Sequence, residues 1–223
     1  MVWSLLLAGL MAAPPALEHA RDAQDRAVLE KLAADANTAS VQAPQDADAQ
    51  YRAALAASYL AEVALELRDR KAAQDAAEQG IRAAERAITL KPEVAEYYRV
   101  LGTLCGQVVP ANVLAGLSYG KRARDAIAKA IEKDPKSPRA YVARGVGNYY
   151  LPAQLGGGAE MAIADFRKAI ALDANSAEAW LWLGVALRKN NQDAEARQAF
   201  TKSLSLDSRR IWVKQQLEKT PAR

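Results

Sequence analysis

The sequence feature that most constrains the fold is a short motif that returns four times along the chain. It reads AITLKP at residues 87–92, AIEKDP at 130–135, AIALDA at 169–174 and SLSLDS at 203–208. Alanine is abundant around these motifs and β-branched residues are scarce, which favours helices that approach one another closely. Four such endings predict at least four helix pairs, stacked so that each pair buries its apolar face against its neighbours.

The last copy shows the repeating unit most clearly. Its first helix carries W-x2-L-G-x2-L, beginning at Trp180, and its second helix carries A-x3-F-x2-S, beginning at Ala196. Gly184 would let the two helices touch backbone to backbone, Ala196 would give the second helix room, and Trp180 and Phe200 would fill the space between them. This pattern resembles the tetratricopeptide repeat, a helix–turn–helix unit of about 34 residues.

The pattern also returns upstream, so the resemblance covers residues 47–219. It implies an all-α, right-handed superhelical solenoid of about four antiparallel helix pairs, the earliest expected at 51–68 and 71–90. A helix at 16–36, followed by a linker to residue 46, and a final helix at 209–219 are expected to cap the two ends. The matching upstream positions are Tyr98, Gly102, Ala123, Ile127, Tyr141, Gly145, Ala162 and Phe166.

Two copies carry extra residues between their paired helices. Gly184 and Ala196 are 12 positions apart in the regular copy, whereas the matching glycine and alanine are 17 apart in the third copy and 21 apart in the second. The extra residues contain prolines, which stop a helix. They predict loops at 108–120 and 151–158 that emerge side by side on one edge of the array.

Three consecutive glycines, Gly156 to Gly158, stand before a predicted helix, whose N-terminus would attract an anion. The Walker phosphate-binding pattern, however, requires Lys and then Ser or Thr after the last glycine. Here Ala159 and Glu160 follow, and a carboxylate in the first turn would repel phosphate. A structural turn is therefore favoured, with a loop that closes on a ligand as the alternative.

The net charge of +4 is distributed unevenly along the chain. Residues 16–70 carry 6 Lys or Arg against 10 Asp or Glu, and residues 136–223 carry 14 against 8. The basic residues stand at helical spacing and form no dense run, which favours a solvated face and no nucleic-acid partner. Lys121, Arg122 and Arg124 are expected at the start of a helix, opposing its dipole. Nearby carboxylates or solvent would balance them, with an anionic partner as the alternative.

Few residues could support catalysis or metal binding. His19 is the only histidine and Cys105 the only cysteine, which excludes a zinc site built from several such ligands. Cys105 is expected to be a buried core thiol without a base. Glu62, Glu66 and Arg70 follow one another at one-turn spacing, which predicts a solvated ladder of ion pairs. No enzymatic activity and no cofactor are predicted.

The resemblance implies a binding groove along the first helices of the repeats. Its middle is apolar and aromatic and its ends are charged, which suits an extended or helical peptide anchored by tyrosines. Tyr149 and Tyr150 are the expected anchors; alternatively, they only pack beneath the glycine loop. The predicted groove residues are Arg99, Thr103, Gln107, Arg139, Val142, Val146, Tyr149, Tyr150, Leu181, Arg188 and Lys189.

These observations favour a non-enzymatic scaffold for protein–protein or protein–peptide interaction. The alternative is small-ligand binding in a pocket formed by the two inserted loops with Tyr149 and Tyr150. The chain is also similar in architecture to mitochondrial regulator-of-microtubule-dynamics proteins, which share an array with long loops inside the helix pairs. That resemblance rests on architecture and transfers no function.

Residues 2–13 form an uncharged apolar run. It is shorter than the about 20 residues that span a bilayer, and it is typical of a signal-peptide core. Residues 1–13 are therefore predicted to be a signal peptide, with an N-terminal helix packed on the body as the alternative. Export would place the chain in the periplasm or outside the cell, as an assembly factor for envelope proteins; otherwise it would be cytoplasmic. No other segment is predicted to cross a membrane.

Overall fold

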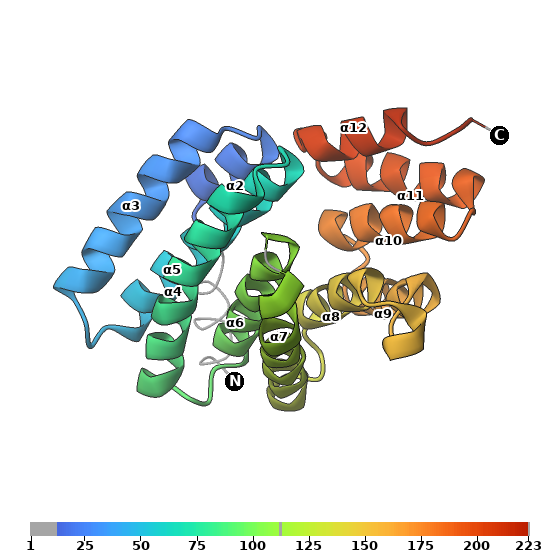
Figure 1. The fold of residues 1–223 in the computed structure, drawn as a ribbon. Helices are drawn as coiled ribbons and strands as arrows, with labels where there is room; N and C mark the ends of the chain where they lie inside the picture. Colours follow the sequence, from blue (N-terminus) through green and yellow to red (C-terminus); the bar gives the residue numbers. More distant parts are fainter. Residues whose placement is uncertain (1–12, 112, 223) are drawn as a thin grey trace, which may run out of the picture.

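The described part of the chain consists of helices joined by short turns. The structure is a computed structural model that describes residues 13–111 and 113–222, and no strand occurs in these residues. Two short 3₁₀ segments, η1 (Val109–Ala111) and η2 (Ala153–Leu155), lie between helices. The α-helices, drawn in Figure 1, are α2 (Pro15–Asp22), α3 (Arg26–Gln42), α4 (Ala47–Glu66), α5 (Arg70–Leu90), α6 (Ala95–Val108), α7 (Val113–Lys133), α8 (Pro138–Tyr150), α9 (Ala159–Leu172), α10 (Ala177–Lys189), α11 (Asp193–Leu206) and α12 (Ile211–Glu218).

The helices pack as four successive pairs: α4 with α5, α6 with α7, α8 with α9, and α10 with α11. The first helices of the pairs also contact one another, α4 with α6, α6 with α8, and α8 with α10. The first helices therefore form an inner layer and the second helices an outer layer (Figure 1). This arrangement confirms the predicted all-α solenoid of helix pairs.

The recurring sequence endings form recurring turns. Asp134, Asp173 and Asp207 each follow the last residue of a second helix. The carboxylate of each accepts a hydrogen bond from the backbone N–H two residues later, at 3.0, 2.9 and 3.0 Å. Ser137 and Ser176 then cap α8 and α10 by accepting from a backbone N–H of the first turn. The two turns with a serine thus satisfy a backbone donor that a helix start leaves unpaired.

The glycines of the repeat pattern mark the closest approaches between paired helices. A Cβ atom at Gly184 would lie 2.6 Å from Cε1 of Phe200, and one at Gly145 would lie 2.5 Å from Cε1 of Phe166. Both phenylalanines are fully buried. The rings therefore occupy the space that a larger residue at either glycine would need, as the sequence predicts.

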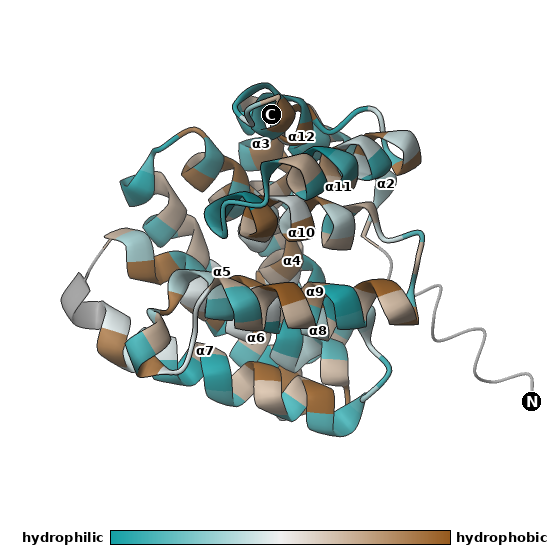
Figure 2. Cartoon of the chain, turned by 90° about the vertical axis from the view of Figure 1, so that its right-hand side faces the viewer, coloured by the Kyte–Doolittle hydropathy of each residue, from teal (hydrophilic) through white to brown (hydrophobic). Residues whose placement is uncertain are grey.

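The apolar interior is divided into two clusters. One extends from Ala13 to Val108, on α2 to α6, and is rich in alanine. The other extends from Val142 to Val213, on α8 to α12, and contains Phe166 and Phe200. Along each helix, hydrophobic and hydrophilic residues alternate (Figure 2), so each helix buries one side and exposes the other.

The N-terminal region differs from its prediction. Residues 16–36 were expected to form one helix with a linker to 46, but α2 ends at Asp22 and α3 continues to Gln42. Gln24, with a positive φ of 51°, turns the chain between them, and Asp25 caps α3. The predicted signal peptide falls mostly on residues 1–12, outside the described residues. No helix among the described residues is long and apolar enough to cross a membrane.

The two insertions also fold differently from each other. The loop predicted at 108–120 is wrong, because α7 begins at Val113 and residues 113–120 form its first turns. Lys121 and Arg122 consequently lie inside α7, where they pair with Asp125 and Glu85. The segment 151–158 contains η2 and the glycines, and Gly156 and Gly158 adopt positive φ of 83° and 107°. These are turn conformations that glycine adopts without strain.

Candidate binding face

The predicted groove residues do not share one environment. Gln107, Val142 and Leu181 are only 9, 8 and 1% exposed, so they pack inside the array and are not available to a partner. The Gln107 side chain donates to the Ser58 carbonyl oxygen at 3.0 Å. These three positions correct the prediction, because the first helices contact one another and bury side chains that an open groove would expose.

An aromatic surface lies on α8 and α10, the last two helices of the inner layer. Tyr149 and Tyr150 lie at the end of α8, with ring centroids 4.9 Å apart and nearly perpendicular planes. Both contact Trp182 of α10, at 6.1 and 6.4 Å between centroids. The Lys189 ammonium lies 4.2 Å from the Tyr149 ring centre, a cation–π distance. Tyr150 remains 65% exposed, so this aromatic surface is open to a partner on one side.

Trp182 is the residue that the sequence prediction missed on this surface. It stands between the two tyrosines and the fully buried Phe166. Its indole N–H donates to Glu178 at 2.7 Å, and its ring lies 5.2 Å from that of Trp212 on α12. These contacts fix the orientation of the ring. Its place two residues after Trp180, on a first helix, is the only sequence signal for it.

A charged group lies on α6 and faces the start of α8, whereas Tyr149 and Tyr150 lie at the end of that helix. Arg99 donates to both carboxylate oxygens of Glu96 at 2.7 Å, and Tyr51 donates to the same carboxylate at 3.1 Å. Burial alone would raise the pKa of Glu96, but Arg99, Arg139 and Tyr51 together hold it below its usual value. Arg99 also reaches Thr103 at 3.4 Å, while Arg139 stays half exposed at 3.8 Å from Glu96. Glu96 is therefore a stable carboxylate that orders the arginines around it.

The remaining predicted groove residues serve the array itself. Arg188 donates to the Gln216 carbonyl and side-chain oxygens at 2.9 and 2.5 Å and to Thr220 at 3.2 Å. It therefore ties α10 to the C-terminal helix. Val146 is partly buried and packs against the second apolar cluster.

Glu62 and Glu66 correct another prediction. They do not form a solvated ladder with Arg70, because both accept hydrogen bonds from Arg210, near the other end of the chain. The distance from Arg210 Nη2 to Glu62 Oε1 is 2.6 Å, and Arg210 is 3% exposed. Burial raises the pKa of Glu62 to about 7, against the opposing effect of Arg210 and helped by Glu178 and Glu66.

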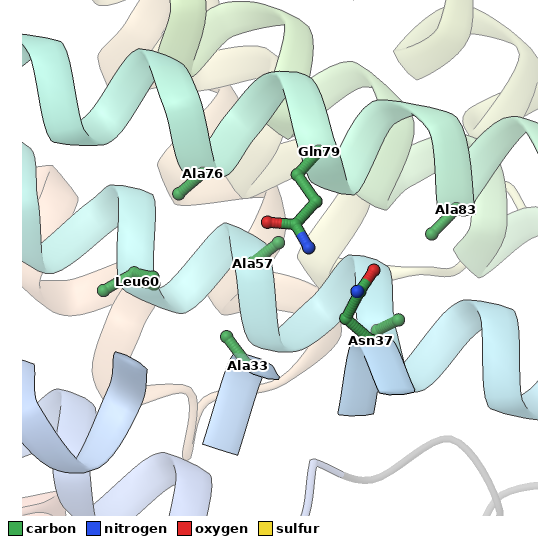
Figure 3. Close-up of a pocket in the computed structure, with 8 residues that line it drawn as sticks. Ala33, Asn37, Ala57, Leu60, Ala76, Gln79 and Ala83 are labelled. Carbon is green, nitrogen blue, oxygen red and sulfur yellow. The ribbon is translucent and has the colours of Figure 1, made fainter. Parts of the chain in front are cut away.

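Two hollows of the structure lie away from the aromatic surface. A cavity of about 10 Å³ between α3, α4 and α5 is lined by alanines with Asn37 and Gln79 (Figure 3), and it has room for one water molecule at most. An open hollow of about 430 Å³ lies on α11, beside Arg197 and Lys202. Neither is lined by Tyr149 or Tyr150.

The described residues offer little reactive chemistry. Cys105 is buried, as predicted, and burial raises the pKa of its thiol to about 11, which keeps it protonated at neutral pH. No group of three or more His, Cys, Asp or Glu side chains in the described part of the chain could hold a metal ion. What the inner layer presents is a surface of aromatic rings and ordered charges.

Comparison with solved structures yields proteins of low sequence identity. A tetratricopeptide-repeat protein of Thermus thermophilus, TTC0263, is 19% identical with a TM-score of 0.59, covering 87% of both chains. The HusA haemophore of Porphyromonas gingivalis is 20% identical with a TM-score of 0.56, covering 93% of this chain and 94% of its own. PilF of Pseudomonas aeruginosa is 19% identical with a TM-score of 0.50, covering 76% of this chain and 68% of its own. These likenesses concern the fold.

Comparison of the sequence itself gives a more specific result, although no curated protein matches it. Residues 166–198 match a tetratricopeptide-repeat profile, which confirms the resemblance seen in the last copy. Residues 17–152, more than half of the chain, match the profile described as Regulator of microtubule dynamics protein 1-3. The chain therefore belongs to the regulator of microtubule dynamics protein 1-3 family, and its C-terminal part carries a tetratricopeptide repeat.

Proposed function

We propose that this protein is a non-enzymatic scaffold that binds a protein or peptide segment on its inner layer of helices. The observation that carries the proposal is the aromatic surface of Tyr149, Tyr150 and Trp182, on which Tyr150 is 65% exposed. Tyrosine and tryptophan are enriched at interface centres, because they bury a large area at a small entropy cost. The partner segment would place an apolar or aromatic side chain on the Tyr150 ring.

The neighbouring contacts make this surface rigid before a partner arrives. Trp182 is held by Glu178 and by Trp212, and Lys189 is held over Tyr149. A preorganised surface loses less conformational entropy on binding than a flexible one. The alternative, a small-ligand pocket formed with the two insertions, receives no support from the hollows found, since neither is lined by these tyrosines.

A site-specific photo-crosslinking experiment tests the binding face. A photoreactive phenylalanine analogue replaces Tyr150 in one full-length variant and Leu117 in another. Leu117 is a matched control, because it is 84% exposed but lies on the outer helix α7. We expect a defined adduct from position 150 that is absent from position 117, and loss of that partner from a Tyr150→Ala bait. Equal adducts from both positions, or none from position 150, would refute the proposed face.

We propose further that the protein works in the cell envelope, assisting the assembly of envelope proteins. This part rests on the apolar run at residues 2–13 alone. Cell fractionation with N-terminal sequencing tests it: a shortened chain in the envelope fraction is expected, whereas an intact chain in the cytosol would overturn it. The family's description names microtubule dynamics; that describes those proteins, and we do not extend it to this chain.

A further inference from the structure

The two ends of the array meet. Arg210, at the start of α12, donates to Glu62 and Glu66 of α4 and to the Arg21 carbonyl oxygen of α2, the last at 3.0 Å. Gln215 of α12 donates to Gln24, just after α2, at 3.0 Å. Figure 1 shows α12 beside α2 and the end of α4, at the top of the molecule. We call this group the terminal clasp: Arg21, Asp22, Gln24, Glu62, Glu66, Arg210 and Gln215.

The clasp is polar, whereas each half of the array is built around an apolar cluster. One apolar cluster ends at Val108 and the other begins at Val142. The two halves are joined on one side by the packing of α8 on α6 and α7. On the other side Arg210 bridges them through hydrogen bonds and ion pairs. The array is therefore a ring in which the two halves meet at two junctions. At one junction helices pack directly on one another, and at the other the halves are held together by charged side chains.

The charges of the clasp do not balance. Asp22, Glu62 and Glu66, with Glu178 of α10 nearby, supply four carboxylates against the two guanidinium groups of Arg21 and Arg210. Arg209 also lies 3.9 Å from Asp22, but its charge is matched by Asp207, with which it pairs at 3.0 Å, so the sum is unchanged. Asp22 Oδ2 and Arg210 Nε are buried without a hydrogen-bond partner. Excess carboxylates and unpaired polar atoms both reduce what a buried ion pair contributes to stability.

We propose that the terminal clasp is a reversible closure, and that when Arg210 leaves Glu62 and Glu66 the two halves of the ring separate and the inner layer widens. The hinge lies where α8 packs on α6 and α7, because these helices stay in contact there when the clasp opens. The closure would control access to the binding face proposed above, and in that respect rests on it. Opening itself is measured without a partner, so the two proposals can fail separately.

The protonation state of the clasp determines at which pH the closed form is favoured. The groups facing Glu62 are Arg21 and Asp22 of α2, Tyr59 and Glu66 of α4, Glu178 of α10, and Arg210. Because burial raises the pKa of Glu62 to about 7, the closed form holds a proton that an open, solvated Glu62 would release. The closed form is therefore favoured at acidic pH and loses this advantage as the pH rises through about 7.

Arg210→Ser is the sharpest variant for testing the closure. Ser137 and Ser176 stand three residues after Asp134 and Asp173 and cap α8 and α10. Arg210 stands at the same place after Asp207 and provides no side-chain cap. The substitution therefore removes the clasp while giving α12 the kind of cap that α8 and α10 have. Arg209→Ser, at the exposed neighbouring residue, is the matched control: it removes the ion pair with Asp207 and a longer one of 3.9 Å to Asp22, but leaves the contacts of Arg210 with Glu62 and Glu66 in place.

Spin labels at Ala23→Cys and Lys214→Cys, both exposed positions, report the distance between α2 and α12, with circular dichroism as a check on folding. Cys105 is fully buried and stays unlabelled. We expect one short distance in the parent and in Arg209→Ser at pH 5.5, a second, longer population at pH 8.5, and mainly the longer one in Arg210→Ser. Glu62→Gln, which cannot ionise, should keep the short distance at both pH values. One unchanged short distance in a folded Arg210→Ser variant, or the same pH response in Glu62→Gln, would overturn the proposal.

Discussion

Two glycines of α8, separated by one residue, should respond in opposite ways to the same substitution. A Cβ at Gly145 would lie 2.5 Å from Phe166 Cε1 and 2.9 Å from two further ring atoms, whereas one at Gly147 would meet nothing within 4 Å. Alanine gains up to about 1 kcal/mol over glycine inside a helix, and overpacking a core costs about 1–3 kcal/mol. Gly147→Ala should therefore stabilise the protein by up to about 1 kcal/mol. Gly145→Ala should be neutral or destabilising by up to about 2 kcal/mol.

The difference between the two variants isolates the helix–helix contact, because the gain in helix propensity is common to both. That difference should be about 1–3 kcal/mol in the free energy of unfolding. Urea unfolding followed by circular dichroism measures it, and tryptophan fluorescence gives a second probe, since Phe166 stacks on Trp182 at 6.3 Å. If Gly145→Ala proved as stable as Gly147→Ala, the close approach of α8 and α9 would not be what requires the glycine.

Three further variants or probes test the buried polar groups. The pKa of Glu62 is about 7 in the folded protein and ordinarily 4.5. The protonated side chain therefore stabilises the folded state, fully below pH 4.5, and this stabilisation is lost as the pH rises through 7. Over that range the parent should lose up to about 3 kcal/mol relative to Glu62→Gln, and parallel unfolding curves would contradict this. Arg210→Ser should cost about 2–4 kcal/mol, because breaking a buried ion pair costs about 3–5 kcal/mol and a serine cap returns about 1 kcal/mol; an unchanged urea midpoint would exclude a stabilising clasp. The thiol of Cys105, buried and with its pKa raised to about 11, should resist a thiol reagent at pH 8 until urea unfolds the chain, and rapid native labelling would place it at the surface.

Features within one repeat could be predicted because they depend on spacing alone. Gly184 and Phe200, like Gly145 and Phe166, belong to one helix pair, and the glycine in each leaves room for the ring. The aspartates at the ends of the second helices likewise act on the backbone two residues later. Interactions over such short separations depend on the local sequence alone, and the helix pairs could therefore be predicted from it.

The start of α7 was mispredicted because local propensity was given too much weight. A loop was predicted from Pro110, Gly116 and Gly120, yet both glycines lie inside α7. Each glycine costs a helix about 1 kcal/mol, which packing of the rest of α7 on α6 can offset. A composition rich in turn residues therefore marks a weak helix here and does not mark a loop.

The groove prediction failed where the same repeat position holds different side chains. Arg99, Val142 and Leu181 occupy one equivalent position on successive first helices. The two apolar residues turn into the contacts between neighbouring helices, while Arg99 pairs with Glu96 on its own helix. A repeat position thus fixes the direction of a side chain only approximately, and the contacts available there decide whether it is buried, as for the polar Gln107 on Ser58.

Arg210 shows which kind of sequence signal can indicate a long-range contact. Glu62 and Arg210 are 148 residues apart, and their meeting depends on the curvature summed over four helix pairs, which no local pattern contains. The cap position is nevertheless informative. Serine caps the helix in two units, and in the last unit an arginine takes the same place without capping it. Giving up a cap costs about 1 kcal/mol, so an arginine kept there is best explained by a contact outside its own unit. In a repeat array, the positions that break the pattern at some local cost are the ones to examine for contacts between its ends.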